Sequence, residues 1–455
     1  MNTALLALGA AAGPILALPF VSRLPRDDAM WLSAATAVLS VALIGASAIG
    51  FVLHPSASTV WLGAAAFQVD GLATTVGPAI AVVGLALILA APRRALDGRF
   101  LIGVLGMTSS GLGALLAGNL AALVAFEVSG IVTLWLVLRD RRGGRLALWT
   151  LGGCGIVWLT AAAWDPAAAA APWGSPAASS QLPPPLLAAL LLSVLGRLGI
   201  VPLNSWATAA TESARPLHVL PALLPLGGVA LAARWLHPQL ALMLPANLQL
   251  QLSSSILALA LVTVGVALVQ QEALRSLAFI LGAVQALVLV AVLDPQPLGH
   301  LGGELLWAAS LVAGAGFTLS VMGARARLGA LDLRQFHGLE RGAPRLALSC
   351  LLFGLALAGL PGSVDFVAQE LLLNAGIAQS TIGIGLAATV AAGLGFATLR
   401  LFFHIYYGPG ESLPELELTT REMVALVPLA TLLLLGGLAP GLLPLLRGAQ
   451  AVHGG

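Results

Sequence analysis

Two ionisable residues lie deep inside apolar runs of this sequence. Glu127 stands near the middle of NLAALVAFEVSGIVTLWLVL, and Arg197 precedes a proline in GRLGIVPLNSW. A carboxylate inside a membrane span indicates function, because hydrocarbon strongly disfavours its charge. Arg197 keeps its proton at accessible pH, so it requires a carboxylate partner, and Glu127 is the candidate. We predict an ion pair whose opening changes the proton affinity of Glu127. The alternatives are a protonated, passive glutamate and a purely structural pair.

A second group of carboxylates occurs in LAGLPGSVDFVAQELLL, just after a predicted helix break at Pro361. Asp365 and Glu370 are five residues apart there and would hold a cation or relay a proton. Asp365 has an alternative role as the N-cap of the following half-helix. Glu370 lies further inside the run and is the preferred candidate.

A histidine and a glutamate open the run HLGGELLWAAS. His300 and Glu304 share one helical face at i, i+4 spacing, and histidine titrates near neutral pH. They form either a proton relay or an interfacial pair that reaches water. The weaker candidates for the path are His218, Arg400 and His404, together with Glu272 and Arg275, which have the alternative of a solvated salt bridge.

The sequence has no motif for a cofactor or a metal. It contains no P-loop, no GxGxxG after a strand, no CxxC and no pair of axial ligands on adjacent runs. We therefore expect no catalytic or redox centre in this chain, so that in a redox enzyme it would be a non-redox subunit.

The composition indicates a membrane protein. Of 455 residues, 59% are hydrophobic and only 9% are charged, whereas a soluble domain carries about 25% charged residues. Apolar runs recur along the chain, each near the ~20 residues that cross ~30 Å of hydrocarbon. These features exclude a soluble globular protein.

The runs predict an all-α polytopic protein of about fourteen transmembrane helices. Helices 7 and 12 should be broken at Pro202 and Pro361, because proline removes a donor and clashes with the preceding turn. The predicted spans are 3–22, 30–53, 72–92, 100–117, 119–138, 146–164, 184–210, 216–235, 250–270, 274–293, 301–323, 344–377, 380–407 and 422–446.

The arginines predict the orientation. Seventeen of the 21 basic residues, all of them arginine, fall in the connections after odd-numbered helices. By the positive-inside rule this face is cytoplasmic. Both termini should then lie outside, in a bacterial inner membrane.

The spacing of the two breaks predicts an internal repeat within one transmembrane domain, 1–455. One block contains helices 4 to 8 (100–236) and the other helices 9 to 13 (250–408), and the fourth helix of each block is broken. A three-helix segment (1–99) precedes the two blocks, and a last helix (409–455) follows them. Because each block has five spans, the second is inverted, as in ion-coupled transporters.

Several motifs together are similar to a known family. In chain order they are FEVSG, GRLGIVPLNSW, EALRSLAF, HLGGELLWAAS, LAGLPGSVDFVAQELLL and LELTTREMVALVPL. They resemble the antiporter-like subunits of complex I (NADH:quinone oxidoreductase), of membrane-bound hydrogenases and of Mrp cation antiporters, over roughly 69–443. The last motif looks most like the chain M type. The resemblance implies fourteen core helices, periplasmic termini, broken helices 7 and 12, and a hydrated polar axis at mid-membrane.

The resemblance also assigns positions. Glu127 matches the family's helix 5 glutamate, Arg197 stands at its helix 7 lysine, and His300 matches the first histidine of its helix 11 motif. The chain departs from the family's helix 11 motif, because Glu304 stands in place of its second histidine and Ala308 in place of its lysine. Gln369 or Glu370 occupies the family's helix 12 position, which holds lysine or glutamate. The lysine relay of the family is therefore altered here.

We predict a proton- or Na⁺-translocating membrane subunit of a multi-subunit, complex I-like or hydrogenase-like oxidoreductase. Its partners would be other membrane and peripheral subunits and the lipid bilayer, with no nucleic acid. Two alternatives remain open. One is the membrane subunit of an ion-gradient-driven inorganic-carbon (CO2/bicarbonate) uptake complex, and the other is a non-conducting scaffold.

Overall fold

The computed structural model gives the fold of most of the chain. The residues described below are 3–54, 58–91, 96–138, 144–173, 175, 182–204, 206–208, 226–375, 380–409 and 417–440.

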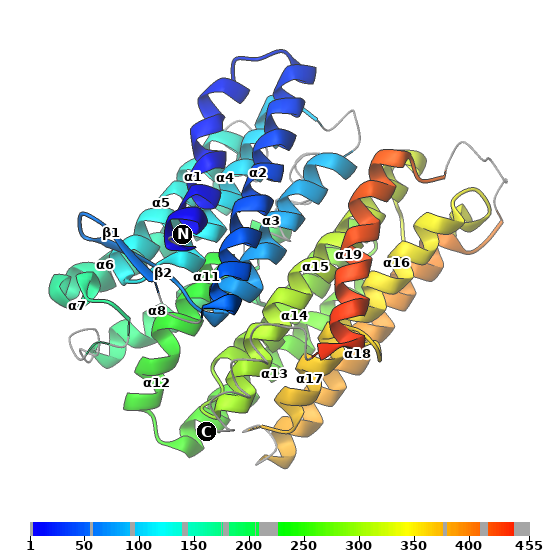
Figure 1. Ribbon diagram of the computed structural model, residues 1–455. Coiled ribbons are helices and arrows are strands. Elements are labelled where there is room, and N and C mark those ends of the chain that lie inside the picture. Colours follow the sequence, from blue (N-terminus) through cyan, green and yellow to red (C-terminus); the bar gives the residue numbers. More distant parts are fainter. Residues whose placement is uncertain are drawn as a thin grey trace.

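Apolar helices pack side by side into a bundle, with the N-terminal helices on one side and the C-terminal half on the other (Figure 1). The long helix α15 runs between them and packs on α3, α14, α16 and α17. The helices are α1 (Thr3–Val21), α2 (Arg26–Leu53), α3 (Gly71–Ala90), α4 (Gly98–Leu116), α5 (Leu120–Leu138), α6 (Gly144–Trp164), α7 (Pro166–Ala170), α8 (Pro184–Arg197), α11 (Leu226–Leu231), η3 (Ala232–Leu236), α12 (His237–Met243), α13 (Ala246–Val269), α14 (Ala273–Val292), α15 (Pro297–Leu328), η4 (Leu339–Arg341), α16 (Pro344–Leu357), α17 (Val364–Leu373), α18 (Thr381–Tyr406) and α19 (Thr420–Leu438).

The helices have the length and surface of membrane spans. Within the described residues, eleven are long and apolar enough to cross a bilayer, and Pro184–Arg197 and Pro344–Leu357 are shorter apolar helices. Large apolar side chains also face outward, among them Trp149, which is 80% exposed. Such a surface suits hydrocarbon rather than water. The predicted class, a polytopic helical membrane protein, is confirmed.

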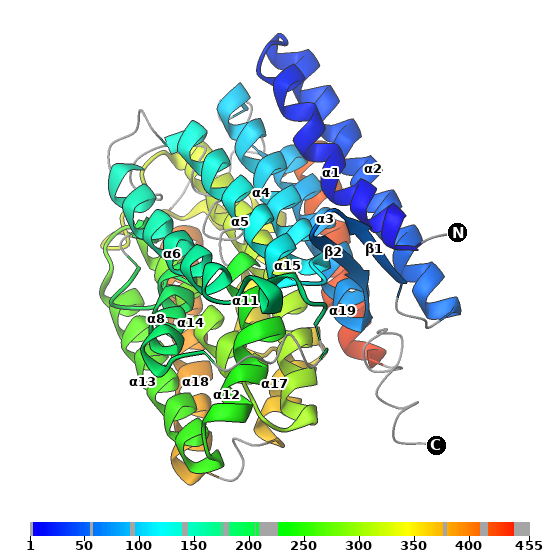
Figure 2. The same cartoon turned by 90° about the vertical axis from the view of Figure 1, so that its left-hand side faces the viewer.

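One element departs from an all-helical chain. A hairpin of β1 (Ser58–Leu62) and β2 (Ala65–Val69) connects α2 to α3 and turns at Gly63, whose φ is +62°. It packs against α1, and β2 also contacts α5 (Figure 2). Asn119 holds it in place, because its side chain accepts from the Ala66 amide and donates to the Ala64 carbonyl. The β-branched residues before the glycine turn were a signal for it in the sequence.

The two predicted breaks have the same local structure. Helix α8 ends at Arg197 and helix α16 at Leu357, several residues before the prolines. Gly199 (φ +69°) and Gly359 (φ +88°) then take the left-handed conformation that favours glycine. In each break a residue after the glycine donates to a carbonyl five residues back, from Ile200 to Leu195 and from Leu360 to Leu355. Glycine therefore ends each first half-helix, and the proline lies beyond that end.

The predicted end of helix 8 at 235 was wrong, because the helix continues through α12 to Met243. Pro238 would normally interrupt it, since proline has no amide to donate. The chain instead widens into the π-helical turn η3, where the His237 amide donates to the Ala232 carbonyl. This wider turn accommodates the proline.

Candidate functional site

A buried ion pair joins α5 and α8. A guanidinium nitrogen of Arg197, Nη2, lies 2.6 Å from Oε1 of Glu127, and the two side chains are 1% and 2% exposed. The predicted partners are thus in contact. The remaining polar atoms of the pair, including Nε and Nη1 of Arg197, have no hydrogen-bond partner among the described residues. A pair buried this deeply is costly to desolvate, so Arg197 and Glu127 depend strongly on each other.

Glycines make room for the arginine beside the break. A Cβ atom at Gly228 of α11 would lie 3.1 Å from Cγ of Arg197, and one at Gly130 of α5 would lie 3.9 Å from its Nη2. Gly228 therefore makes room for the aliphatic part of the Arg197 side chain, whereas Gly130 lies at an ordinary contact distance from its guanidinium. Beyond the break, a Cβ at Gly282 of α14 would lie only 2.6 Å from the Gly199 carbonyl oxygen. The unwound backbone of the first half thus contacts the second half directly.

The second half also contains buried polar atoms, on three helices that pack in sequence. Gln285 lies on α14 one turn after Gly282, and α14 packs on α15, which packs on α17. Polar side-chain atoms on these three helices are buried without hydrogen-bond partners among the described residues, and they belong to Gln285, Trp307, Thr318, Asp365 and Gln369. Buried polar atoms are normally hydrogen-bonded to protein or water. Buried polar atoms that have no hydrogen-bond partner in the described protein are expected where water molecules occupy the interior, as in a hydrated path.

Asp365 belongs to this series and does not cap its helix. Ser363 caps α17, because its hydroxyl accepts from the Phe366 amide. The carboxylate of Asp365 is fully buried, and neither oxygen has a hydrogen-bond partner among the described residues. The capping alternative is therefore wrong. A carboxyl group in this position needs a proton or water to satisfy it.

Glu370, the preferred carboxylate of this segment from sequence, is on the outer surface of α17. It is exposed and accepts a hydrogen bond from the Asn374 side chain at 3.1 Å. A residue five positions after Asp365 points to a different face of the helix. Gln369, at i+4 from Asp365, is the neighbour on the buried face.

His300 and Glu304 lie together at the start of α15, with 3.4 Å between Nε2 and Oε1. His300 also stacks on His237 of α12, with 4.4 Å between ring centroids. His300 and Glu304 line a cavity of about 480 Å³, here called the α3–α15 cavity. Asp70 and Arg234 line the same cavity. The structure thus places the predicted pair where water can reach it.

The ion pair between Asp70 and Arg234 was not predicted as a site. Nη1 and Nη2 of Arg234 donate to the two carboxylate oxygens at 2.8 and 3.1 Å, and Arg234 also donates to the Leu115 carbonyl. Burial alone would raise the pKa of Asp70, but the charge and hydrogen bonds of Arg234 outweigh burial and hold that pKa below its ordinary value. Two ionisable residues next to apolar runs were the signal for this pair in the sequence.

Replacing Asp70 by asparagine should lower the free energy of unfolding by about 1–3 kcal/mol at neutral pH, since Arg234 loses a charged partner. Asparagine can still cap α3, where the Asp70 side chain accepts from the Ala73 amide. The pKa of Asp70 is lower in the folded state than in the unfolded state, where it is about 3.9. The ion pair therefore contributes to the free energy of unfolding above pH ~3.9, and this contribution is lost as the pH falls through the folded-state pKa. Thermal unfolding of both proteins across that range measures the difference.

Asp165→Asn is the matched control for this experiment, because the Asp165 side chain caps α7 by accepting from the amide three residues on, as Asp70 does in α3. It should change the midpoint of unfolding little. A difference between Asp70→Asn and wild type that stays constant from neutral pH to pH ~2 would contradict the ion-pair explanation.

The weaker candidates form structural contacts. Glu272 pairs with Arg325 at 3.2 Å, Arg400 donates to the Gln270 carbonyl, and His404 stacks on Phe336. Arg275 lies beside Glu272 in a surface cavity. These contacts tie helix ends together, and none of them involves the buried series. His218 lies outside the described residues. Among the described residues, no cluster of three or more histidine, cysteine or acidic side chains could hold a metal.

The fold and the site define a class of protein, a polytopic membrane protein with two interrupted helices and ionisable side chains buried beside them. Within this class, the family described as "NADH:quinone oxidoreductase/Mrp antiporter, TM" matches residues 179–395. The fold is similar over 98% of the chain to one in respiratory complex I from Thermus thermophilus with bound NADH (TM-score 0.81, 23% identity, 98% of that chain). It is likewise similar to one in the Mrp complex from Dietzia sp. (TM-score 0.79, 17% identity, 98% and 96% covered). These matches confirm the resemblance to the antiporter-like subunit family.

The matches to relatives in sequence cover only part of this chain and part of each relative. NADH-quinone oxidoreductase subunit N of Halorhodospira halophila is 29% identical over 229 residues, which are 49% of this chain and 47% of the relative. The matched segment thus spans about half the length of that relative. Relatives named subunit M and subunit N both match, so the matches do not single out the chain M type.

Proposed function

We propose that this chain is a proton-translocating membrane subunit of a multi-subunit complex related to complex I. The observation that carries the proposal is the set of buried polar atoms that lack a hydrogen-bond partner among the described residues, which includes atoms of Glu127, Arg197 and Asp365. Such groups are expensive in a membrane protein unless they handle a charge. The relatives that are subunits of NADH-quinone oxidoreductase support the assignment.

In this mechanism the first half holds the proton at Glu127. The nearby guanidinium of Arg197 favours the carboxylate form, so Glu127 takes a proton only when the pair separates. Arg197 is a positioning residue, because it keeps its own proton. The break after Arg197 provides backbone that can move, and its Gly199 carbonyl lies against α14.

In the second half Asp365 is the carrier, in the helix that follows the second break. The path from the first half reaches it along Gln285, Trp307 and Gln369, whose unsatisfied atoms can hold water. His300 and Glu304 then connect the path to the α3–α15 cavity. By the arginine distribution this cavity faces the outer side of the membrane.

The side chains favour a proton over Na⁺. A metal cation in protein needs several oxygen ligands around it, whereas Glu127 is occupied by a guanidinium and Asp365 has no second carboxylate among its hydrogen-bond partners in the described residues. A single carboxyl group is sufficient to carry a proton. We therefore assign proton transport, with Na⁺ as the second candidate.

The test is reconstitution of the complex isolated with the full-length chain. Substrate-driven acidification or alkalinisation of proteoliposomes should occur without Na⁺, and Na⁺ should not change its rate. Uptake that requires Na⁺ would overturn the choice of ion. Isolation with a large carbonic-anhydrase-like protein, in place of oxidoreductase subunits, would favour inorganic-carbon uptake. Normal turnover without any ion movement through this chain would favour a scaffold.

A further inference from the structure

The last described helix, α19, runs beside α15, and its C-terminal end contacts the second break (Figure 1). We infer that Gly437 of α19 positions the Asp365 carboxyl group, by fixing the backbone from which α17 starts. The inference rests on the proposed function, in which Asp365 carries the proton. Gly437 is a positioning residue, because it acts through the backbone of the break.

At this contact α19 and the break are closer than a side chain would allow. A Cβ atom on Gly437 would overlap the Gly362 carbonyl oxygen and the Ser363 carbonyl carbon. Backbone atoms cannot rotate aside as the end of a side chain can. Leu438 covers Gly362 as well, since a Cβ atom on that glycine would lie 3.8 Å from Cδ2 of Leu438. Only glycine permits such an approach, so a side chain in place of Gly437 must displace one of the two backbones.

The backbone under Gly437 is the start of α17. The Ser363 hydroxyl accepts from the Phe366 amide at 3.3 Å, and the Ser363 carbonyl accepts from the Val367 amide at 3.4 Å. Asp365 lies two residues after this cap, in a helix of only 10 residues. A helix this short depends on packing for its position. A shift of its cap therefore moves the Asp365 carboxyl group.

Helix α15 also contacts α17 through a glycine. A Cβ atom on Gly302 would lie 3.1 Å from the Ala368 carbonyl oxygen. Gly302 stands between His300 and Glu304 on α15. The contacts with α15 and α19 together therefore determine where Asp365 lies relative to the His300–Glu304 pair.

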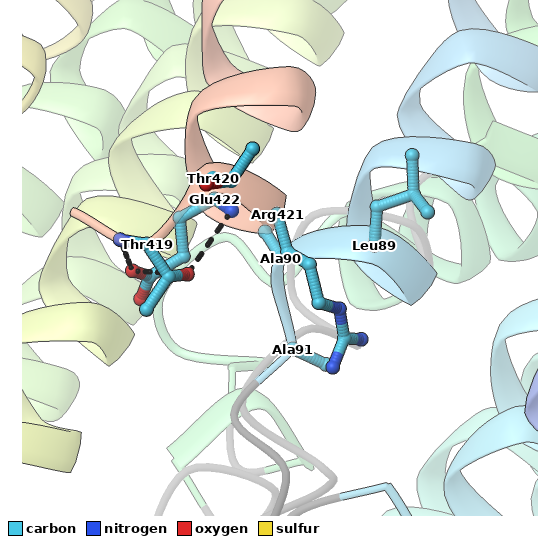
Figure 3. Close-up of a pocket in the computed structure, with 7 residues that line it drawn as sticks. All are labelled: Leu89, Ala90, Ala91, Thr419, Thr420, Arg421 and Glu422. Carbon is cyan, nitrogen blue, oxygen red and sulfur yellow. Dashed lines mark hydrogen bonds between the residues drawn. The ribbon is translucent and has the colours of Figure 1, made fainter. Parts of the chain in front are cut away.

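The other end of α19 is fixed to α15. Both carboxylate oxygens of Glu422 accept from Arg327, in the last turn of α15, at 2.8 and 3.0 Å. Figure 3 shows the Glu422 carboxylate folded back on Thr419, whose amide donates to it, while the Thr419 hydroxyl accepts from the Glu422 amide. Leu429 and Leu433 bury the side of α19 that follows. Because α19 is anchored along its length, an added side chain at its end should displace the break.

The test compares Gly437→Ala with a glycine change that meets no obstacle. Gly385 of α18 is the matched control, because a Cβ atom there has no described neighbour within 4 Å. In the complex isolated with the full-length chain, Gly437→Ala should raise amide hydrogen exchange over 363–373 about fivefold, the effect of losing an N-cap. Gly385→Ala should leave this exchange unchanged.

Infrared spectroscopy with isotope-labelled aspartate reports on Asp365 itself. The carboxyl vibration that disappears in Asp365→Asn belongs to this residue, in either protonation state. Gly437→Ala should shift that vibration and Gly385→Ala should not, because only the first change moves the carboxyl group. Gly437→Ala should also lower proton translocation roughly tenfold, since a misplacement of ~1 Å can cost ~10²-fold in rate. Exchange and vibration that change while translocation stays normal would refute the proton path and leave the positioning intact.

Leu438→Ala keeps the test decisive if Gly437→Ala does not assemble. It removes packing from Gly362 without adding an atom, and Leu438 is 73% exposed, so this variant should fold. Exchange over 363–373 should rise in it too. Wild-type exchange and an unshifted Asp365 vibration in every variant of this contact that assembles would overturn the inference. Equal changes in Gly385→Ala would also overturn it.

Discussion

Replacing Glu127 by glutamine should abolish proton translocation by the assembled complex and also destabilise the chain. The variant leaves the Arg197 guanidinium, 1% exposed, without a counter-charge. Breaking a buried pair in this way costs about 3–5 kcal/mol of unfolding free energy. Proton uptake by proteoliposomes and thermal unfolding in detergent measure the two effects separately.

The double variant Glu127→Gln with Arg197→Gln separates transport from folding. Because no unpaired charge remains, most of the lost stability should return. Translocation should stay absent, since glutamine cannot carry a proton. Glu340→Gln, an exposed glutamate of η4, is the matched control and should behave as wild type. Translocation that survives in the single variant, or returns in the double variant, would refute the role of Glu127.

Replacing Asp365 by asparagine should have the opposite effect on stability. Its carboxylate is fully buried and has no hydrogen-bond partner among the described residues. Removing the possibility of a buried charge should leave stability unchanged or raise it by about 1 kcal/mol. Translocation should fall at least tenfold, on the order of the loss of a proton carrier. The same two assays measure both quantities.

Ser363→Ala provides the comparison for Asp365→Asn. It removes the cap of α17 and should cost about 1 kcal/mol of stability. If Asp365→Asn instead destabilised the protein by several kcal/mol, its carboxylate would have a structural partner. Unchanged translocation in Asp365→Asn would remove it from the path.

Much of the site was predictable because hydrocarbon makes buried charges rare. Glu127 and Arg197 were predicted as partners from their positions in apolar runs, and the structure places them 2.6 Å apart. The membrane class followed from composition, and the two breaks followed from the prolines, although glycines end the first half-helices. The count of fourteen spans, the inverted repeat and the outward termini remain predictions.

Other features of the site depend on which face of a helix a residue occupies. The position of a residue in the sequence does not by itself show which face is buried. Asp365 and Glu370 are in the same segment, yet Asp365 is buried with no hydrogen-bond partner for its carboxylate among the described residues, whereas Glu370 is exposed. Capping was open as an alternative for Asp365, but Ser363, two residues earlier, caps the helix instead. The Asp70–Arg234 pair joins residues 164 positions apart. Local patterns mark each residue beside an apolar run but do not show that the two meet.

The two interrupted helices are alike in their backbone but differ in charge. Each ends in a left-handed glycine with the same return hydrogen bond, but only the first has an arginine as its last residue. Adding a proton beside Arg197 therefore leaves that half with an excess positive charge, whereas adding one to Asp365 leaves its half electrically neutral. A proton should consequently reside more easily at Asp365 than at Glu127, so two equivalent backbones would hold protons with different affinities.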